Sequence, residues 1–212
     1  MRMTQAYLKR DEQNKAVVLW ELLVASAQFE EIRRYAQFNL MQFYFKEQDY
    51  AKAVNYAETI LGLNALDEQI KWDALYILAK AAEVQKNLPK AATAYAQLEK
   101  APQAERAVEA LFFNAQEKHK EKAYAASNVV IEKIAQNYAG FPEWNAKSLL
   151  LMAQNFYALE DAFQASFILE SLIENFAQFP EIKAQASEEL EKIKALEAKE
   201  NASINSDNNA NE

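Results

Sequence analysis

The heptapeptide NYAGFPE at residues 137–143 recurs as NFAQFPE at residues 175–181, 38 positions later. The two copies differ only where Tyr138 becomes Phe176 and Gly140 becomes Gln178. Similarity at a fixed spacing of about 20–50 residues is typical of arrays that repeat one supersecondary unit. This repeat constrains the possible folds more than any other feature of the chain.

Upstream, the alignment of the two copies extends as a trio: a small residue followed by apolar residues four and seven positions later. The trio begins at residues 16, 53, 91, 127 and 165, with gaps of 37, 38, 36 and 38. Residues i, i+4 and i+7 share one face of an α-helix, so each trio predicts the apolar stripe of one helix. The five trios are Ala16, Trp20, Leu23; Ala53, Ala57, Ile60; Ala91, Tyr95, Leu98; Ser127, Ile131, Ile134; and Ala165, Leu169, Leu172.

A second helix is predicted before each trio. The residues twelve positions upstream are mostly small, which lets two helix backbones approach closely; they are Thr4, Met41, Ala79, Ala115 and Ala153. Short polar breaks at 46–49, 85–87, 118–122 and 159–161 separate the two helices. Each unit is therefore a predicted helical hairpin. The fourth is expected to be distorted or shifted, because Asn114 and Lys118 occupy positions that are usually apolar.

Composition agrees with an all-α chain and excludes several classes of function. Only 2 Gly and 4 Pro occur among 212 residues, too few for the turns of a strand-rich fold. The net charge of -8 repels a polyphosphate backbone, so we expect no nucleic-acid partner. No apolar run is long enough to span a bilayer, so we expect no direct membrane insertion, and the segment 1–15 lacks the apolar core of a signal peptide.

No catalytic or metal-binding constellation is evident. Without Cys, thiolate catalysis and zinc–thiolate sites are excluded. Gly62 and Gly140 stand alone, whereas phosphate loops and nucleophile elbows need several glycines. His119 lies among charged residues and is expected to be a solvated turn residue. The chain is therefore predicted to be no enzyme and to bind no cofactor and no metal.

The hairpin pattern resembles the tetratricopeptide repeat (TPR) family. The clearest copy spans residues 37–61, where Leu40, Tyr44, Asp49, Tyr50 and Ala53 occupy the family's positions. The resemblance covers residues 1 to about 176. It implies an α–α superhelix, a right-handed solenoid of helical hairpins.

A narrower resemblance lies at residues 144–176, where Phe163, Gln164 and Ala165 are similar to the closing repeat of large multi-TPR proteins of Gram-negative bacteria. It implies that the chain is the C-terminal end of a longer array. Residue 1 falls inside a predicted first helix, as expected of a fragment or, alternatively, of a late start codon. By the same resemblance, the expected location is the cell envelope, either periplasmic or associated with the outer membrane, with the cytoplasm as the alternative.

One repeat domain is expected over residues 1–198, with units at about 1–30, 34–67, 72–101, 108–138 and 146–176. A capping helix over 181–198 is predicted from the apolar stripe of Ile182, Ala186, Leu190, Ile193 and Leu196. Residues 199–212 have almost no bulky apolar side chains and are expected to form a disordered acidic tail.

The resemblance implies a non-enzymatic scaffold that binds a protein or peptide along the concave face formed by the first helices. The alternative is a structural module that self-associates, as a homodimer for example. In this register the expected groove residues are Tyr35, Phe38, Gln42, Phe45, Tyr76, Lys80, Phe112, Gln116, Gln154 and Tyr157. Exposed aromatics usually mark contact sites, but these could equally pack on a neighbouring hairpin, Phe38 and Phe112 above all.

Overall fold

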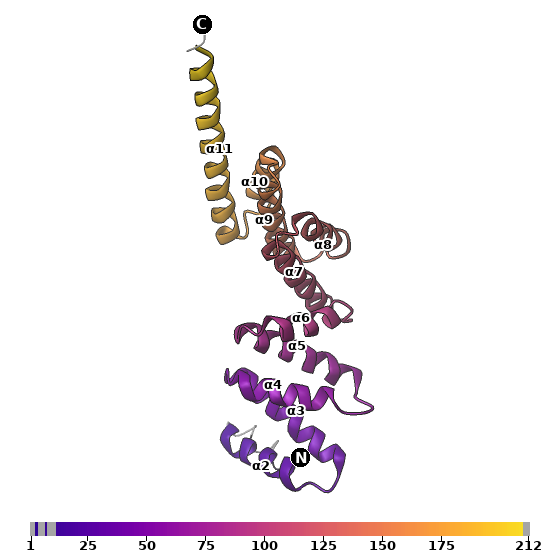
Figure 1. The fold of residues 1–212 in the computed structure, drawn as a ribbon. Coiled ribbons are helices and arrows are strands. Elements are labelled where there is room, and N and C mark those ends of the chain that lie inside the picture. The colour runs from indigo at the N-terminus through magenta and orange to yellow at the C-terminus, as the bar shows by residue number, and fades with distance from the viewer. Residues whose placement is uncertain (1–2, 4–6, 8–11, 210–212) are drawn as a thin grey trace. The chain divides into compact units, whose positions relative to one another are not determined.

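The part of the chain that the structure describes is built from α-helices alone. A computed structural model describes the backbone of residues 3, 7 and 12–209 and the side chains of 3, 7 and 12–199. Over these residues it has ten helices and no strand (Figure 1), which confirms the predicted all-α class. The helices are α2 (Gln13–Ser26), α3 (Glu30–Lys46), α4 (Tyr50–Leu61), α5 (Glu68–Val84), α6 (Leu88–Leu98), α7 (Ala104–Lys120), α8 (Tyr124–Asn137), α9 (Pro142–Ala158), α10 (Ala162–Asn175) and α11 (Pro180–Asn209).

The helices form hairpins whose spacing follows the sequence repeat. The first helices α3, α5, α7 and α9 each have 17 residues and begin at residues 30, 68, 104 and 142. Their partners α4, α6, α8 and α10 begin at residues 50, 88, 124 and 162. Helix α2 is the second helix of the first predicted unit, whose first helix falls mainly on residues outside the described part.

The predicted trios form the buried faces of the second helices. The small residue that opens each trio is fully buried in all five units, and Leu23 is the only apolar member that is merely half-buried. Met41, Ala79, Ala115 and Ala153 on the first helices are buried as well, whereas Thr4 lies outside the described residues. Small side chains at these crossings allow the two helices of a hairpin to pack closely.

Every described turn within a hairpin uses the same backbone geometry. Gln48, Lys86, Lys122 and Glu160 have φ of 61°, 59°, 62° and 64°, in the left-handed region that non-glycine residues seldom adopt. In the last three turns, the next residue's N–H donates to the carbonyl five residues earlier, as Asn87 does to Ala82 at 2.9 Å. This closure satisfies carbonyls that the end of the first helix would otherwise leave unpaired.

The same turns begin the second helix with a side-chain cap in three hairpins. The carboxylates of Asp49 and Asp161 and the amide oxygen of Asn87 each accept from the backbone N–H three residues later. In the fourth hairpin the equivalent residue is Ala123, and α8 has no side-chain cap. A Ser, Thr, Asp or Asn cap satisfies one of the free N–H groups at a helix start, so α8 begins with one fewer such hydrogen bond.

The chain divides into two compact units, residues 1–102 and 103–212, where the sequence predicts one domain over 1–198. The boundary lies in the loop between α6 and α7, where the spacing of the repeat is shortest. In the first unit, α2 to α6 pack consecutively, and α5 also packs on α3. The Tyr44 hydroxyl on α3 donates to the Glu21 carboxylate on α2 at 2.6 Å, and burial, reinforced by this carboxylate, raises the pKa of Tyr44.

In the second unit α7 to α11 pack in the same order. Helix α9 also packs on α7, and α11 on α9. One core lies between the fourth and fifth hairpins around Val108, Ile131 and Ile134. Another joins α9, α10 and α11 around Leu169, Leu172 and the buried Ala186, Leu190 and Ile193.

The expected distortion of the fourth unit is wrong. Helix α7 is regular, because its buried face is carried by other residues, such as Val108 and Ala115. Lys118 is only half-buried, and a long aliphatic stem can cover apolar surface while its amine reaches water.

Helix α11 occupies the place of a further first helix, because α9 begins at residue 142 and α11 at residue 180, one repeat later. Leu150 and Ala153 of α9 belong to the core that α9 shares with α10 and α11, and at the equivalent positions of α11 stand the exposed Glu188 and Glu191. This face of α11 therefore offers another hairpin no apolar surface, as expected for a capping helix. The helix continues to Asn209, past residue 198 and into the predicted disordered tail. Asn, Ser and Asp, which are weak helix formers, make up most of residues 200–209, so this extension depends on propagation from a helix already formed, which needs no new nucleus.

None of the described helices is both long enough and apolar enough to cross a membrane.

A candidate partner-binding cleft

The ten predicted groove residues lie on first helices, and none of them is fully buried. Four lie on α3, of which Gln42 is exposed and Tyr35, Phe38 and Phe45 are half-buried. The Phe45 ring meets Tyr50 of its own hairpin edge-on, with the ring centroids 6.0 Å apart. Tyr76 and Lys80 are half-buried on α5, with the Lys80 amine 3.8 Å from the Glu83 carboxylate.

In the second unit the predicted residues serve two different purposes. Phe112 on α7 packs at the border of the core, its ring centroid 5.5 Å from that of Trp144 on the next hairpin. Packing on a neighbouring hairpin is the alternative role for this ring, and the structure supports it. Gln116 is half-buried nearby. Gln154 and Tyr157, on α9, instead line a cleft together with residues of α11.

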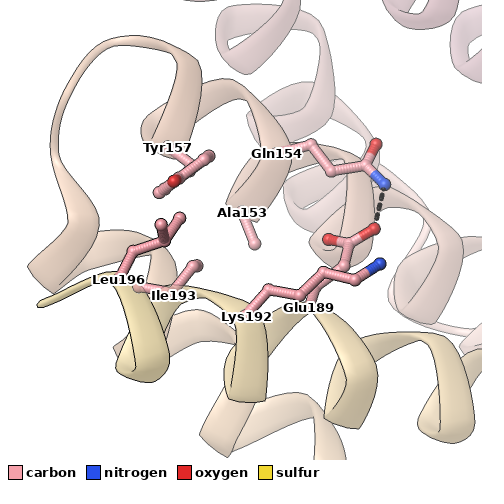
Figure 2. Close-up of a pocket in the computed structure, with 7 residues that line it drawn as sticks. All are labelled: Ala153, Gln154, Tyr157, Glu189, Lys192, Ile193 and Leu196. Carbon is pink, nitrogen blue, oxygen red and sulfur yellow. Dashed lines mark hydrogen bonds between the residues drawn. The ribbon is translucent and has the colours of Figure 1, made fainter. Parts of the chain in front are cut away.

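The cleft lies between α9 and α11 and has a volume of about 320 Å³. Figure 2 shows Tyr157, Ile193 and Leu196 gathered at one end and Gln154, Glu189 and Lys192 at the other, with Ala153 between them. Ala153 and Ile193 are buried, whereas Tyr157 and Leu196 keep 43% and 46% of their surface exposed. The cleft therefore has a buried apolar floor, two exposed apolar walls and one charged rim.

The repeat explains why this space is open. The equivalent place in the preceding pair of first helices, α7 and α9, is occupied by His119 and Asn155, and one repeat later the corresponding residues are Tyr157 and Ile193. The His119 Nδ1 and the Asn155 Oδ1 are 2.7 Å apart, so a hydrogen bond joins α7 to α9 there. Ile193 offers no polar atom to Tyr157, and the corresponding link between α9 and α11 cannot form.

Asn155 is the centre of a buried polar network. Its amide nitrogen donates to Ser127 Oγ at 2.9 Å and to Asn128 Oδ1 at 2.8 Å, and Ser127 Oγ donates to the Ala115 carbonyl at 2.8 Å. The amide oxygen is therefore the acceptor for His119, whose Nδ1 must carry the proton. The expectation that His119 is a solvated turn residue is wrong, because α7 continues to Lys120 and turns the half-buried imidazole towards α9.

The charged rim of the cleft is arranged by two polar contacts. Gln154 Nε2 donates to the Glu189 carboxylate at 2.6 Å, which connects α9 to α11 (Figure 2). Lys192 forms an ion pair with Glu188 at 2.6 Å, and their hydrogen bond lowers the pKa of Glu188 and raises that of Lys192. Glu189 also interacts electrostatically with Lys192, but Lys192 is hydrogen-bonded to Glu188, so the three groups leave one net negative charge at the rim.

The composition of the lining is that of a site which binds an apolar group. The lining has no Ser, Thr, Cys or His, so it holds no Ser, Thr or Cys nucleophile beside a His base. Within the described residues, no group of three or more His, Asp or Glu is placed to hold a metal ion. An apolar floor with a few polar groups at one edge is the usual composition of a site that orients an apolar ligand group.

The α11 residues of the cleft are absent from the predicted groove set. The sequence places Ile193 and Leu196 on the stripe of the capping helix, and Glu189 and Lys192 on its solvated face. The sequence contained one indication of this surface, because the apolar stripe of the capping helix continues to Leu196. The equivalent residue of α9 is Ala158, which is exposed. An apolar residue at a position that the preceding repeat leaves exposed indicates a surface available for contact.

Compared with known protein families and with curated proteins of known function, the chain matches none.

Proposed function

We propose that the chain is a non-enzymatic scaffold of TPR-like hairpins that binds a protein or peptide along its first helices. The observation that carries the proposal is the cleft between α9 and α11, which combines two predicted groove residues, Gln154 and Tyr157, with an apolar floor. In this proposal an apolar side chain of the partner enters the cleft and its flanking residues meet the charged rim.

Tyr157 and Leu196 support this role because they come from two different helices and expose their surface around one space. Covering such apolar surface is the main favourable term in most protein association. Interface energy is usually concentrated in a few residues near a desolvated pocket, with Tyr among the enriched types. A groove between two helices also suits an amphipathic partner helix, which inserts side chains from one face.

The experiment is a selection of peptides from a random displayed library on the folded protein, followed by affinity measurement of the selected peptides. Two variants remove the walls of the cleft, Tyr157→Ala and Leu196→Ala. Val129→Ala is the matched control, since Val129 is an exposed apolar residue on α8, outside the cleft. We expect both cleft variants to weaken the selected peptides by at least about tenfold and the control to leave them unchanged.

Peptides that bind all three variants as tightly as the unmodified chain would refute the cleft as the binding site. Circular dichroism of each variant verifies that it is folded. Both wall residues are partly exposed, so their truncation should cost little stability.

Self-association is the second candidate, favoured by the exposed Val18 and Leu22, one turn apart on α2. Light scattering tests it, because a monomer over a wide concentration range would exclude it. By the resemblance of its closing repeat, the proposed location is the cell envelope of a Gram-negative bacterium, and fractionation of cells would test that location.

A further inference from the structure

We infer that the partner of the α9–α11 cleft is a basic amphipathic segment, with Lys or Arg beside the apolar side chain that enters the cleft. This inference rests on the proposed function, because it takes the cleft as the binding site and specifies the chemistry of its occupant. Three features carry it: the distribution of charge along the chain, the pairing of the cations on α11, and the division of the cleft into an apolar and a charged end.

The net charge of the protein is concentrated in the part of the sequence that contains α11, one of the two helices that line the cleft. Residues 1–159 carry 19 acidic and 19 basic side chains, whereas residues 160–212 carry 12 acidic and 4 basic ones. The whole net charge of -8 thus belongs to the last quarter of the sequence, which contains α10 and α11. A surface with one dominant sign of charge attracts ligands of the opposite sign and accelerates their association.

The cations of α11 offset this charge only in part, since residues 160–199 carry nine acidic and four basic side chains. Lys192, at the cleft rim, is paired with Glu188 at 2.6 Å, and Lys194 is paired with Glu170 of α10 at 2.7 Å. Glu189 accepts from the neutral amide of Gln154 and also interacts electrostatically with Lys192. Since Lys192 is hydrogen-bonded to Glu188, Glu188, Glu189 and Lys192 together carry one net negative charge, and Glu191 and Glu197 are exposed on the same helix. The negative charge at the rim is therefore available to a cationic side chain of a partner.

These charges exclude other occupants. A phosphate-bearing or acidic ligand would be repelled by the carboxylates of α11. A second copy of this chain, docking through the same region, would bring two acidic surfaces together, which opposes association. A basic segment is the occupant whose charge is complementary.

The shape of the cleft indicates the form of that segment. A volume of about 320 Å³ lies at the lower end of the roughly 300–1,000 Å³ typical of ligand pockets, so it suits one or two apolar side chains. Tyr157, Ile193 and Leu196 surround the apolar end, and Glu189 lies at the other end (Figure 2). An amphipathic helix with a bulky apolar residue and a Lys or Arg one turn away would reach both ends.

Three synthetic peptides of roughly 14 residues, about four helical turns, test the inference by fluorescence anisotropy on the full chain. The first has Leu and Phe on one face and Lys at the polar positions. The second replaces every Lys with Glu, and the third keeps Lys but replaces the apolar residues with Ser. We expect only the first to bind well, with an affinity that falls as salt is added because the attraction is screened.

Protein variants then assign the binding to the cleft. Tyr157→Ala and Leu196→Ala should weaken the basic amphipathic peptide by at least about tenfold. Glu189→Gln keeps a side chain that can still accept from Gln154 but removes the charge, and should weaken this peptide about threefold to tenfold. The matched control is Glu132→Gln, because Glu132 is an exposed acid on α8, and it should change nothing.

Failure of this inference is distinguishable from failure of the proposed function. If the Glu peptide binds as tightly as the Lys peptide and both depend on Tyr157 and Leu196, the cleft is a binding site but its partner is not basic. If the Lys peptides bind with or without apolar residues and ignore the cleft variants, the acidic surface attracts cations without using the cleft, and the inference is overturned. Absence of binding by the basic amphipathic peptide also overturns it, while the library selection still decides the proposed function.

Discussion

Ala123→Asp should stabilise the second unit by providing the cap that the fourth hairpin lacks. Asp49, Asn87 and Asp161 occupy the equivalent position in the other described hairpins and accept from the backbone N–H three residues later at 3.2, 3.3 and 3.0 Å. Ala123 already has nearly the same backbone conformation, with φ of -83° and ψ of 55°, compared with -85° and 70° at Asn87. The new carboxylate would therefore face the N–H of Ala126 without rearrangement of the turn.

The expected gain is about 1 kcal/mol, within the roughly 0.5–2 kcal/mol that separates Asp or Asn from Ala at an N-cap. Interaction of the negative charge with the start of the helix adds about 0.3–1 kcal/mol at low ionic strength. A gain of this size should raise the Tm of a unit of about 100 residues by roughly 4–8 °C. Differential scanning calorimetry and urea unfolding of the full chain measure both quantities.

Two further variants separate the contributions and test the reasoning. Ala123→Asn supplies an acceptor without charge and should retain most of the gain at high salt. Asp161→Ala removes the equivalent cap from the next hairpin and should lower the stability by about 1 kcal/mol. The reasoning would be refuted if Ala123→Asp left the Tm unchanged while the fold was intact, or if Asp161→Ala did not lower the stability. In either case the same cap geometry would not contribute a similar stabilisation in each hairpin.

Other consequences of the structure can be measured in the same way. Asn155→Ala should lower the free energy of unfolding by about 2–4 kcal/mol, since it leaves buried partners of Asn155 without their hydrogen bonds. The control is Asn137→Ala, at an exposed helix end, which should change the stability by less than about 0.5 kcal/mol. Urea unfolding measures both variants. Tyr44→Phe should reduce the loss of stability on going from pH 8 to pH 11. The pKa of Tyr44 is raised in the folded protein, so Tyr44 contributes its full stabilisation below the ordinary tyrosine pKa of about 10. This contribution is lost as the pH rises above that value. An equal loss in Tyr44→Phe and the unmodified chain would contradict this role.

Much of the fold could be predicted because its information is local and repeated. The trios such as Ala53, Ala57 and Ile60 require only that residues four and seven apart share a helix face, and all five lie in helices with the small residue buried. Helix ends were harder to predict: the continuation of α11 to Asn209 depends on helix propagation, which composition alone did not reveal. The division after Pro102 was also not predicted, because the repeat continues across it with only a small change of spacing.

The candidate site was only partly predictable. Gln154 and Tyr157 followed from the repeat register, but the residues opposite them on α11 depend on how a capping helix lies against α9. Phe112 occupies a repeat position predicted to face the groove, yet it packs against Trp144. No local pattern in the sequence distinguishes a groove residue from one that packs on the next hairpin. The role of Asn155 also depends on contacts with His119 and Ser127, which are far from it in the sequence.

By itself, the sequence determined the unit: a repeated helical hairpin, its buried stripe, its polar turns and its excess of acid, since each follows from spacing and composition along the chain. The tertiary structure alone decided where neighbouring hairpins close against each other and where they remain open. That choice depends on pairs of side chains brought together from different helices. A His and an Asn seal one junction with a hydrogen bond, while a Tyr and an Ile at the equivalent positions leave a cleft.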